Sequence, residues 1–255
     1  MEIKRFFSKT KQENGQTQPT VFHITHYKAG SQWVYAILRE IVGDRITAPL
    51  PGAEHVTKHP ISRGKIYPCV YLPKEQFESL DLPGEYRNFI VIRDLRDTLI
   101  SHYFSMVYSH PILKSRMQKA RERLKHMSVQ EGLLDIIRRR WIPAEIQRTW
   151  AHNDSLVIRY EDLNANEYEI FQKIMTACDI EFTSSALKAA VEAHSFEKKA
   201  GRKKGQEDIG SHHRKGIVGD WRNYFDEAVT AAFKERFGDV LIETGYEKDY
   251  DWGPE

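Results

Sequence analysis

Short apolar runs alternate along the chain with apolar residues at helical spacing. The runs, which are typical of buried parallel strands, are residues 21–25, 89–92 and 156–158, and the helical patterns that follow them are residues 31–42, 95–107 and 167–178. A strand followed by a helix several times over predicts right-handed crossover units. We therefore expect an α/β fold in which helices flank both faces of a central parallel β-sheet.

The middle of the chain is predicted to be helical. Ser128 and Glu131 have the spacing of a capping box, which would begin a helix that runs through Arg140. Pro143 is expected to interrupt this helix before it continues over residues 144–150. A further helical pattern covers residues 228–240 near the end of the chain.

Two segments lack any apolar periodicity. Residues 197–213 are rich in Lys, Arg, Gly and Gln, which predicts a long mobile loop of the kind that often forms a lid. Residues 1–18 are polar and are expected to be a flexible leader, so that a single domain would cover residues 19–255.

Composition narrows the class of protein. The chain has 255 residues with a formal net charge of +2 and 40% hydrophobic residues, which disfavours a nucleic-acid-binding protein and excludes wholesale disorder. Only two cysteines occur, Cys69 and Cys178, so a disulfide framework and a four-cysteine zinc site are excluded. No apolar run is long enough to span a membrane and no secretory signal is visible, so we expect a cytoplasmic protein.

The first strand and helix are joined by a segment that suits an anion. Lys28 supplies a positive charge, Gly30 allows close approach of the backbone, and Ser31 adds a hydroxyl where the unpaired N–H groups of a helix begin. A nucleoside-triphosphate P-loop places its lysine after the last glycine, followed by a hydroxyl for magnesium, whereas Lys28 precedes Gly30. An ordinary strand-to-helix turn with a solvated lysine is the alternative interpretation.

A second segment strengthens the anion hypothesis. Arg93 ends a predicted strand, and Ser101 lies about two turns into the next helix. Because an arginine and a helical hydroxyl can reach one phosphate over the carboxyl end of a strand, this segment predicts a second phosphate site. Two such sites on neighbouring strands indicate a nucleotide that carries phosphates at two positions.

Four motifs in order resemble those of one enzyme family. Residues 25–33 (THYKAGSQW) resemble the first motif, T-Y-P-K-S-G-T-T-W, and residues 93–103 match the second, R-[ND]-P-[KR]-D-x-x-x-S-x-Y, with Leu95 in place of proline. Residues 159–163 read R-Y-E-D-L, which is the third motif. Residues 214–225 match the fourth, R-K-G-x-x-G-D-W-[KR]-x-x-F, in full. The family is that of the cytosolic small-molecule sulfotransferases, which use 3′-phosphoadenosine 5′-phosphosulfate (PAPS) and release adenosine 3′,5′-bisphosphate (PAP). The resemblance implies a P-loop-like domain and no metal.

The resemblance also implies roles for individual residues. Lys28, Ala29, Gly30, Ser31 and Gln32 would hold the 5′-phosphosulfate, with Lys28 easing departure of the phosphate. The 3′-phosphate would be bound by Arg93, Ser101, Arg214, Lys215 and Gly216. Trp33, Tyr160 and Phe196 would lie beside the adenine.

The chain departs from the family at the position of the general base. Where the family has K-T-H-L-P, residues 69–73 read C-V-Y-L-P, so Tyr71 replaces the histidine. A phenol with its ordinary pKa of about 10 is a poor base at neutral pH. His26, His55 and His59 are further candidates, and Tyr71 and His59 are the two on which the catalytic assignment is made.

Several alternatives stay open. The acceptor is expected to be a hydroxyl of a small molecule, a phenol or an alcohol, or else an amine; a homodimer is compatible with the sequence. The missing histidine leaves a PAP- or PAPS-binding protein with little or no turnover as one rival, and a P-loop kinase is a second. Lysines and arginines between residues 198 and 204 would steer an anionic cofactor.

Overall fold

Four parallel strands form the centre of the described chain, in the order β2–β1–β3–β4. The strands are β1 (Thr20–Thr25), β2 (Ile66–Val70), β3 (Tyr86–Ile92) and β4 (Leu156–Arg159). The computed structural model describes residues 18–109, 111, 115–152, 154–211 and 213–254. Nearly all of the predicted leader therefore lies outside the described residues, and the single domain over residues 19–255 stays a prediction.

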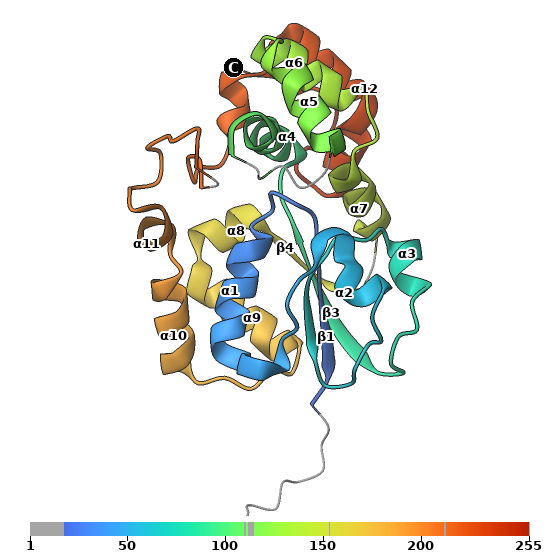
Figure 1. Cartoon of the computed structure of the whole chain (residues 1–255), viewed down its shortest axis with the longest axis vertical. Helices are drawn as coiled ribbons and strands as arrows, with labels where there is room; N and C mark the ends of the chain where they lie inside the picture. Colours follow the sequence, from blue (N-terminus) through green and yellow to red (C-terminus); the bar gives the residue numbers. More distant parts are fainter. Residues whose placement is uncertain (1–17, 110, 112–114, 153, 212, 255) are drawn as a thin grey trace, which may run out of the picture.

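Alternating side chains of the strands pack against helices on both faces of the sheet (Figure 1). On one face, Val21 and Val91 belong to one apolar cluster with residues of α1 (Ser31–Val42), α9 (Glu167–Ala177) and α10 (Ser184–Ala193). On the other face, Phe22 and Ile90 contact α2 (Glu54–Thr57), α3 (Lys74–Glu78) and α7 (Ile142–Trp150). The expected α/β fold, with a central parallel sheet and helices on both faces, is confirmed.

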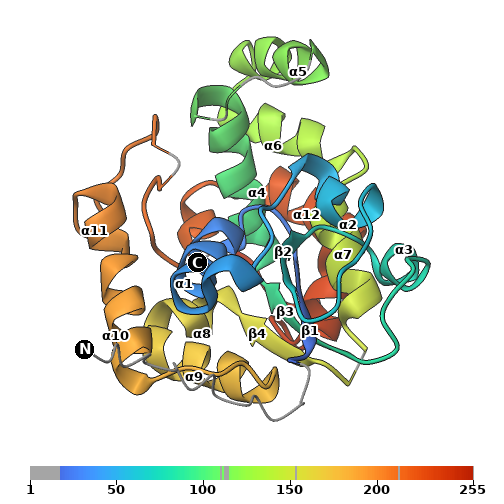
Figure 2. The same cartoon turned by 60° about the horizontal axis from the view of Figure 1, so that its bottom comes forward.

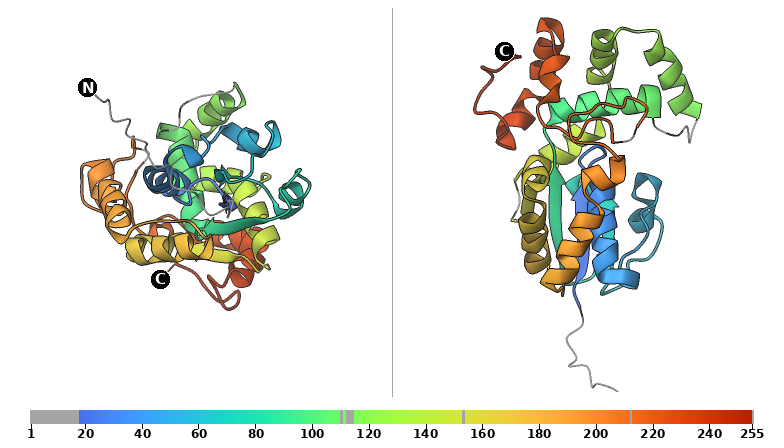
Figure 3. Two further views of the ribbon diagram at one scale, coloured as in Figure 1. Left: turned by 90° about the horizontal axis from the view of Figure 1, so that it is seen from below. Right: turned by 90° about the vertical axis from the view of Figure 1, so that its left-hand side faces the viewer.

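A layer of helices lies over the carboxyl ends of the strands (Figure 1; Figure 3, right). Its helices are α4 (Leu95–Phe104), which continues as a π-helical turn over Ser105–Ser109, α5 (Ser115–Lys125), α6 (Val129–Ile137) and α12 (Glu227–Glu243). Trp221 and Phe233 lie in the apolar core of this layer. The layer therefore closes the end of the sheet at which both predicted phosphate-binding segments begin.

The remaining helices lie along the side of α1. They are α8 (Tyr160–Ala165), directly after β4, and α11 (Phe196–Ala200), directly after α10. Figure 2 shows α10 and α11 beside α1, and the chain that follows α11 turns back toward α1. Short 3₁₀ helices cover Gly43–Arg45, Pro51–Ala53 and Asp220–Asn223. No described helix is both long and apolar enough to cross a bilayer.

Local predictions differ from the structure at four places. The pattern missed β2, an edge strand that contains Pro68, because a proline within an apolar run disfavours a strand except at a sheet edge. The helix expected to reach Arg140 ends at Ile137, and Pro143 lies in the first turn of a new helix, where its missing N–H removes no bond. The segment predicted to be entirely loop opens with one short helix that ends at Ala200. The helix predicted over residues 95–107 is α-helical only to Phe104 and continues as the π-helical turn.

Candidate functional site

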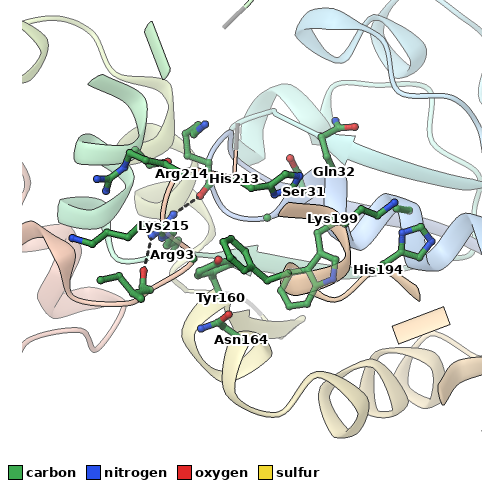
Figure 4. Close-up of a pocket in the computed structure, with 18 of the residues that line it drawn as sticks. Ser31, Gln32, Arg93, Tyr160, Asn164, His194, Lys199, His213, Arg214 and Lys215 are labelled. Atoms are coloured by element: carbon green, nitrogen blue, oxygen red, sulfur yellow. Dashed lines mark hydrogen bonds between the residues drawn. The ribbon is translucent and has the colours of Figure 1, made fainter. Parts of the chain in front are cut away.

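A cavity of about 290 Å³ lies at the carboxyl ends of β1 and β3, beneath the chain that follows α11. Figure 4 shows Arg93, Arg214 and Lys215 at one end of it and His194 and Lys199 at the other. Of the residues assigned to cofactor binding, those that line the cavity are Lys28, Gly30, Ser31, Gln32, Trp33, Arg93, Ser101, Tyr160, Phe196, Arg214, Lys215 and Gly216. Ala29 is fully buried, so only its backbone belongs to the loop around the cavity.

The loop between β1 and α1 has the backbone of an anion cradle. Lys28 and Gly30 have φ of 71° and 77°, which turns the chain tightly before α1 begins at Ser31. The first N–H groups of a helix have no partner within it, and the helix dipole is positive there. A Cβ atom at Gly30 would lie 3.0 Å from Cδ2 of Tyr160, so glycine also permits the close packing of that ring.

Arg93 connects this loop to two other segments. Its guanidinium donates to the carbonyl oxygen of Lys28 (3.1 Å) and to that of Ile217 (3.4 Å), and it stacks 4.6 Å from the ring centroid of Tyr160. Asp97, one turn along α4, lies 3.7 Å from the same guanidinium. Arg93 therefore holds the cradle, α4, α8 and the chain before Asp220 together around the cavity.

The motif that begins at Arg214 is fixed by carboxylates, of which Asp97 and Asp220 are buried. Asp97 accepts hydrogen bonds from the N–H groups of Gly219 (2.7 Å) and Trp221 (3.0 Å). Arg214 pairs with Asp220 and with Glu207, and Lys215 donates to Asp220 at 2.6 Å. Although burial acts to raise it, the hydrogen bonds from Lys215 and Arg214 hold the pKa of Asp220 below its ordinary value.

Three aromatic side chains line the cavity. The rings of Trp33 and Tyr160 lie 6.3 Å apart at 74°. Phe196 packs directly on the backbone of Gly216, where a Cβ atom would lie 2.5 Å from the ring, and φ of Gly216 is 67°. Such surfaces suit a flat, aromatic ligand beside the cations.

The cavity is positively charged. Burial, together with the charges of Arg93 and Arg214, lowers the pKa of Lys28 to about 8. An anion between these three side chains would therefore be stabilised by all of them.

The candidate bases are placed differently from one another. Tyr71 follows β2 and its hydroxyl lies 2.7 Å from the Ser31 hydroxyl, although Tyr71 itself does not line the cavity. His59 is exposed, outside the cavity lining. His55 is buried and hydrogen-bonded to the carbonyl of Pro68 (2.7 Å), which attaches α2 to β2.

His26 is a buried link between the ends of two strands. It accepts from the N–H of Arg93 (3.3 Å), while its other ring nitrogen contacts the carbonyl of Tyr27 (3.0 Å). Burial lowers the pKa of His26 to about 4, so its imidazole stays neutral. The contacts of His26 indicate a structural role in positioning Arg93.

Sequence reasoning missed several residues that line the cavity, namely Asn164, Glu167, His194, His213 and Ile217, whereas Lys199 is one of the cations expected to steer an anionic cofactor. Asn164 follows Tyr160 at i+4 within α8, so helical spacing could have found it, whereas Glu167 begins the next helix, α9. His194 and His213 belong to the segment between the third and fourth motifs, which carries no periodic signal, and Ile217 is an unspecified position within the fourth motif. Among the described residues, no group of three or more His, Cys, Asp or Glu side chains could hold a metal ion.

Comparison with known proteins adds to this geometry. The sulfotransferase domain model matches residues 85–245, a range that contains three of the four motifs and leaves residues 25–33 outside. A search of curated proteins found no match.

One of the similar solved structures shares the fold. A mouse sulfotransferase, SULT7A1, complexed with PAP is 19% identical, with a TM-score of 0.61 over 88% of this chain and 84% of that one. A retinol dehydratase in complex with androsterone and inactive cofactor PAP (16% identity, TM-score 0.46, 87% and 80% coverage) and a sulfotransferase from Alicyclobacillus acidocaldarius (10%, 0.46, 90% and 95%) are more distant. The match to the sulfotransferase domain model covers well over half of this chain, so the chain belongs to the sulfotransferase domain family.

Proposed function

We propose that this chain transfers a sulfuryl group from PAPS to a hydroxyl group, or an amine, of a small molecule and releases PAP. The observation that carries the proposal is the cavity itself, because it collects cations and aromatic rings from segments as distant as Lys28, Arg93, Tyr160 and Arg214. Charges and rings together suit a nucleotide with phosphates at two positions.

The lining supports an assignment of each part of the cofactor. We assign the 5′-phosphosulfate to Lys28 and the backbone of residues 29–32, the 3′-phosphate to Arg93, Ser101, Arg214, Lys215 and Gly216, and the adenine to Trp33, Tyr160 and Phe196. The lowered pKa of Lys28, which follows first from burial and then from the charges of Arg93 and Arg214, is compatible with this assignment. A polyanionic ligand would supply the missing negative charge.

The residues around the anion cradle would act mainly during the transfer of the sulfuryl group. PAPS supplies the sulfuryl group, and its phosphate gains negative charge as the bond to sulfur breaks. Lys28 and the N–H groups at the start of α1 would stabilise that charge, because they are already oriented and partly shielded from water. In the sequence, Tyr71 occupies the position at which the family has its histidine.

The first test is transfer of radiolabelled sulfuryl from PAPS to a panel of phenols, alcohols, amines and glycans. We expect labelled product with the wild-type chain and a loss of about 100- to 1000-fold in kcat for Lys28→Ala, which removes charge from the site of the leaving group. Lys188→Ala, an exposed lysine on α10 outside the cavity, is the matched control and should not change the rate.

Thermal shift separates the rival functions. PAP should stabilise the protein against heat, because a ligand that binds only the folded state raises its stability. Stabilisation by ATP with magnesium and not by PAP would favour a kinase. Stabilisation by PAP without product from any acceptor would favour a binding protein, the rival that the replacement of histidine by Tyr71 supports. The cytoplasmic location, the homodimer and chemistry without a metal stay predictions.

A further inference from the structure

A single acidic side chain contributes to the wall of a cavity that is otherwise rich in cations. Among the described residues that line the cavity, Glu167 is the one carboxylate. It is the first residue of α9, and its side chain is only 18% exposed. A carboxylate repels phosphates but accepts hydrogen bonds from neutral donors. Glu167 therefore suits a part of the ligand that carries hydrogen-bond donors and no negative charge.

Asn164 lies near Glu167 and close to the aromatic side chains of the cavity. It follows Tyr160 by one helical turn within α8, so both side chains are on the same face of that helix, and both line the cavity. Figure 4 shows Asn164 beside Tyr160, across the cavity from Ser31 and Gln32. Within the described part of the chain, its side-chain amide has no hydrogen-bond partner. A flat base packed against Tyr160 would direct one edge toward this amide.

One ammonium group holds Asn164 and Glu167 together. Nζ of Lys204 donates to the backbone carbonyl of Asn164 (3.0 Å) and lies 3.6 Å from a carboxylate oxygen of Glu167. Burial raises the pKa of Glu167, and the charge and hydrogen bond of Lys204 act to lower it. The pairing favours the ionised carboxylate, which accepts hydrogen bonds and donates none, whereas the amide of Asn164 can donate.

The neighbouring polar side chains at this end of the cavity have different chemistry. Lys199 is a donor only. Nε2 of His194 lies 2.5 Å from a carboxylate oxygen of Glu40, and its Nδ1 is buried. Glu167 is thus the side chain that combines an acceptor with a place in the cavity lining beside the aromatic rings.

Adenine carries a donor and an acceptor side by side. Its 6-amino group donates hydrogen bonds, and the ring nitrogen next to that group accepts them. A carboxylate and an amide on one wall of the cavity offer the complementary pair, an acceptor from Glu167 and a donor from Asn164.

Building on the proposed function, we propose that Glu167 and Asn164 determine the specificity of the site for a base with an exocyclic amino group. The carboxylate of Glu167 accepts a hydrogen bond from the 6-amino group of adenine, and the amide of Asn164 donates to the adjacent ring nitrogen. The rings of Trp33, Tyr160 and Phe196 supply contact area that any flat base would use. Glu167 distinguishes adenine by its amino group.

Binding measurements test this proposal without any turnover. Calorimetry compares PAP with purine riboside 3′,5′-bisphosphate, which is PAP without the 6-amino group. The wild-type chain should bind PAP about 10- to 100-fold more tightly than this analogue, as expected for a hydrogen bond to a charged group. In Glu167→Ala the preference should fall to about threefold or less. Glu167→Gln keeps an oxygen that accepts and should retain part of the preference.

Matched variants separate recognition of the base from structural effects. Glu169→Ala removes an exposed carboxylate on α9 outside the cavity lining and should keep the full preference. Lys204→Ala removes the ammonium but leaves the carboxylate, so the affinities for both ligands should change by the same factor. Asn164→Ala should also lower both affinities by one factor, because both ligands contain the ring nitrogen.

The outcomes distinguish this proposal from the proposed function. Equal affinity of the wild-type chain for PAP and the analogue would overturn the specificity role alone. Loss of the preference in Lys204→Ala to the same extent as in Glu167→Ala would show that Glu167 acts only by holding the segment after α11, which also overturns it. Unchanged affinities in Asn164→Ala would overturn the role of the amide. No binding of either ligand to the wild-type chain would overturn the proposed function as well.

Discussion

The pKa of Lys28 depends on the residues that surround its side chain. Its backbone is in the left-handed region (φ 71°), and its side chain shares the cavity with Arg93 and Arg214. Burial is the largest cause of its lowered pKa, and the two guanidinium groups add to it. A lysine with a pKa of about 8 is poised to gain a proton when an anion arrives.

We expect proton uptake when PAP binds near pH 8. The phosphates favour the charged ammonium and raise the pKa of Lys28, so the fraction that is neutral in the free protein, about half at this pH, takes up a proton. PAP affinity should accordingly fall as the pH rises through about 8. Calorimetry in two buffers of different ionisation enthalpy measures the uptake.

Lys28→Arg is the control for this prediction. A guanidinium stays charged throughout this range, so the variant should bind PAP without proton uptake near pH 8. Equal uptake by the variant and the wild type would show that another group takes the proton.

At the scale of elements, the chain after α11 is tethered across the mouth of the cavity. Gly205 donates to the carbonyl of Lys215 (2.8 Å) and Asp208 to that of Arg214 (2.9 Å), which folds this chain back on itself. The ammonium of Lys204 donates to the carbonyl of Asn164 (3.0 Å) and lies 3.6 Å from Glu167. Lys204 thereby attaches the segment to α8 and α9, on the side of the cavity opposite the cradle.

Removing this tether should loosen the segment. In Lys204→Ala, the amides of Gly205 and Asp208 should exchange with solvent at least several-fold faster, because the open form becomes more populated. Hydrogen exchange read by mass spectrometry on peptides over residues 201–211 measures the change, and PAP should slow the exchange in both proteins. Lys203→Ala, the neighbouring exposed lysine, is the control; equal exchange in the two variants would contradict a role for the Lys204 contacts.

Across the whole molecule, Arg96 joins the upper helical layer to the end of the chain. It is 3% exposed, pairs with Asp94 (2.7 Å) and Glu247 (2.5 Å), and its guanidinium stacks on the rings of Trp221 (4.1 Å) and Trp252 (4.6 Å). Removing one partner of a buried ion pair leaves the other charge uncompensated.

Arg96→Met should therefore lower the free energy of unfolding by about 3–5 kcal/mol. Arg148→Met is the matched control, because Arg148 forms a surface pair with Asp239 in which both side chains are more than 40% exposed, and it should cost less than about 1 kcal/mol. Urea unfolding followed by tryptophan fluorescence measures both. A loss in Arg96→Met no larger than in the control would show that the pair does not hold the layer to the C-terminal segment.

The sequence by itself determined the elements whose residues carry a local signal. The apolar run before Thr25 matches β1, and the helical pattern that begins at Ser31 matches α1. A strand buried on both faces gives a continuous apolar run, and a helix buried along one stripe gives apolar residues at helical spacing, so both can be recognised in the sequence. The capping box of Ser128 and Glu131 is present, since both of its hydrogen bonds form within four residues. The residues predicted to line the nucleotide site share one cavity, apart from buried Ala29, because parallel strands end at the same edge of the sheet.

Only the tertiary structure decided which side chains meet across long stretches of chain. Tyr71 contacts Ser31 and His59 lies outside the cavity lining, although the two were about equally plausible bases in the sequence. His26, a further candidate, receives the N–H of Arg93. Such contacts depend on strand order and on the path of connecting loops, and neither leaves a periodic trace in the residues themselves. The pKa values of these groups likewise follow burial, which exists only once the chain has folded.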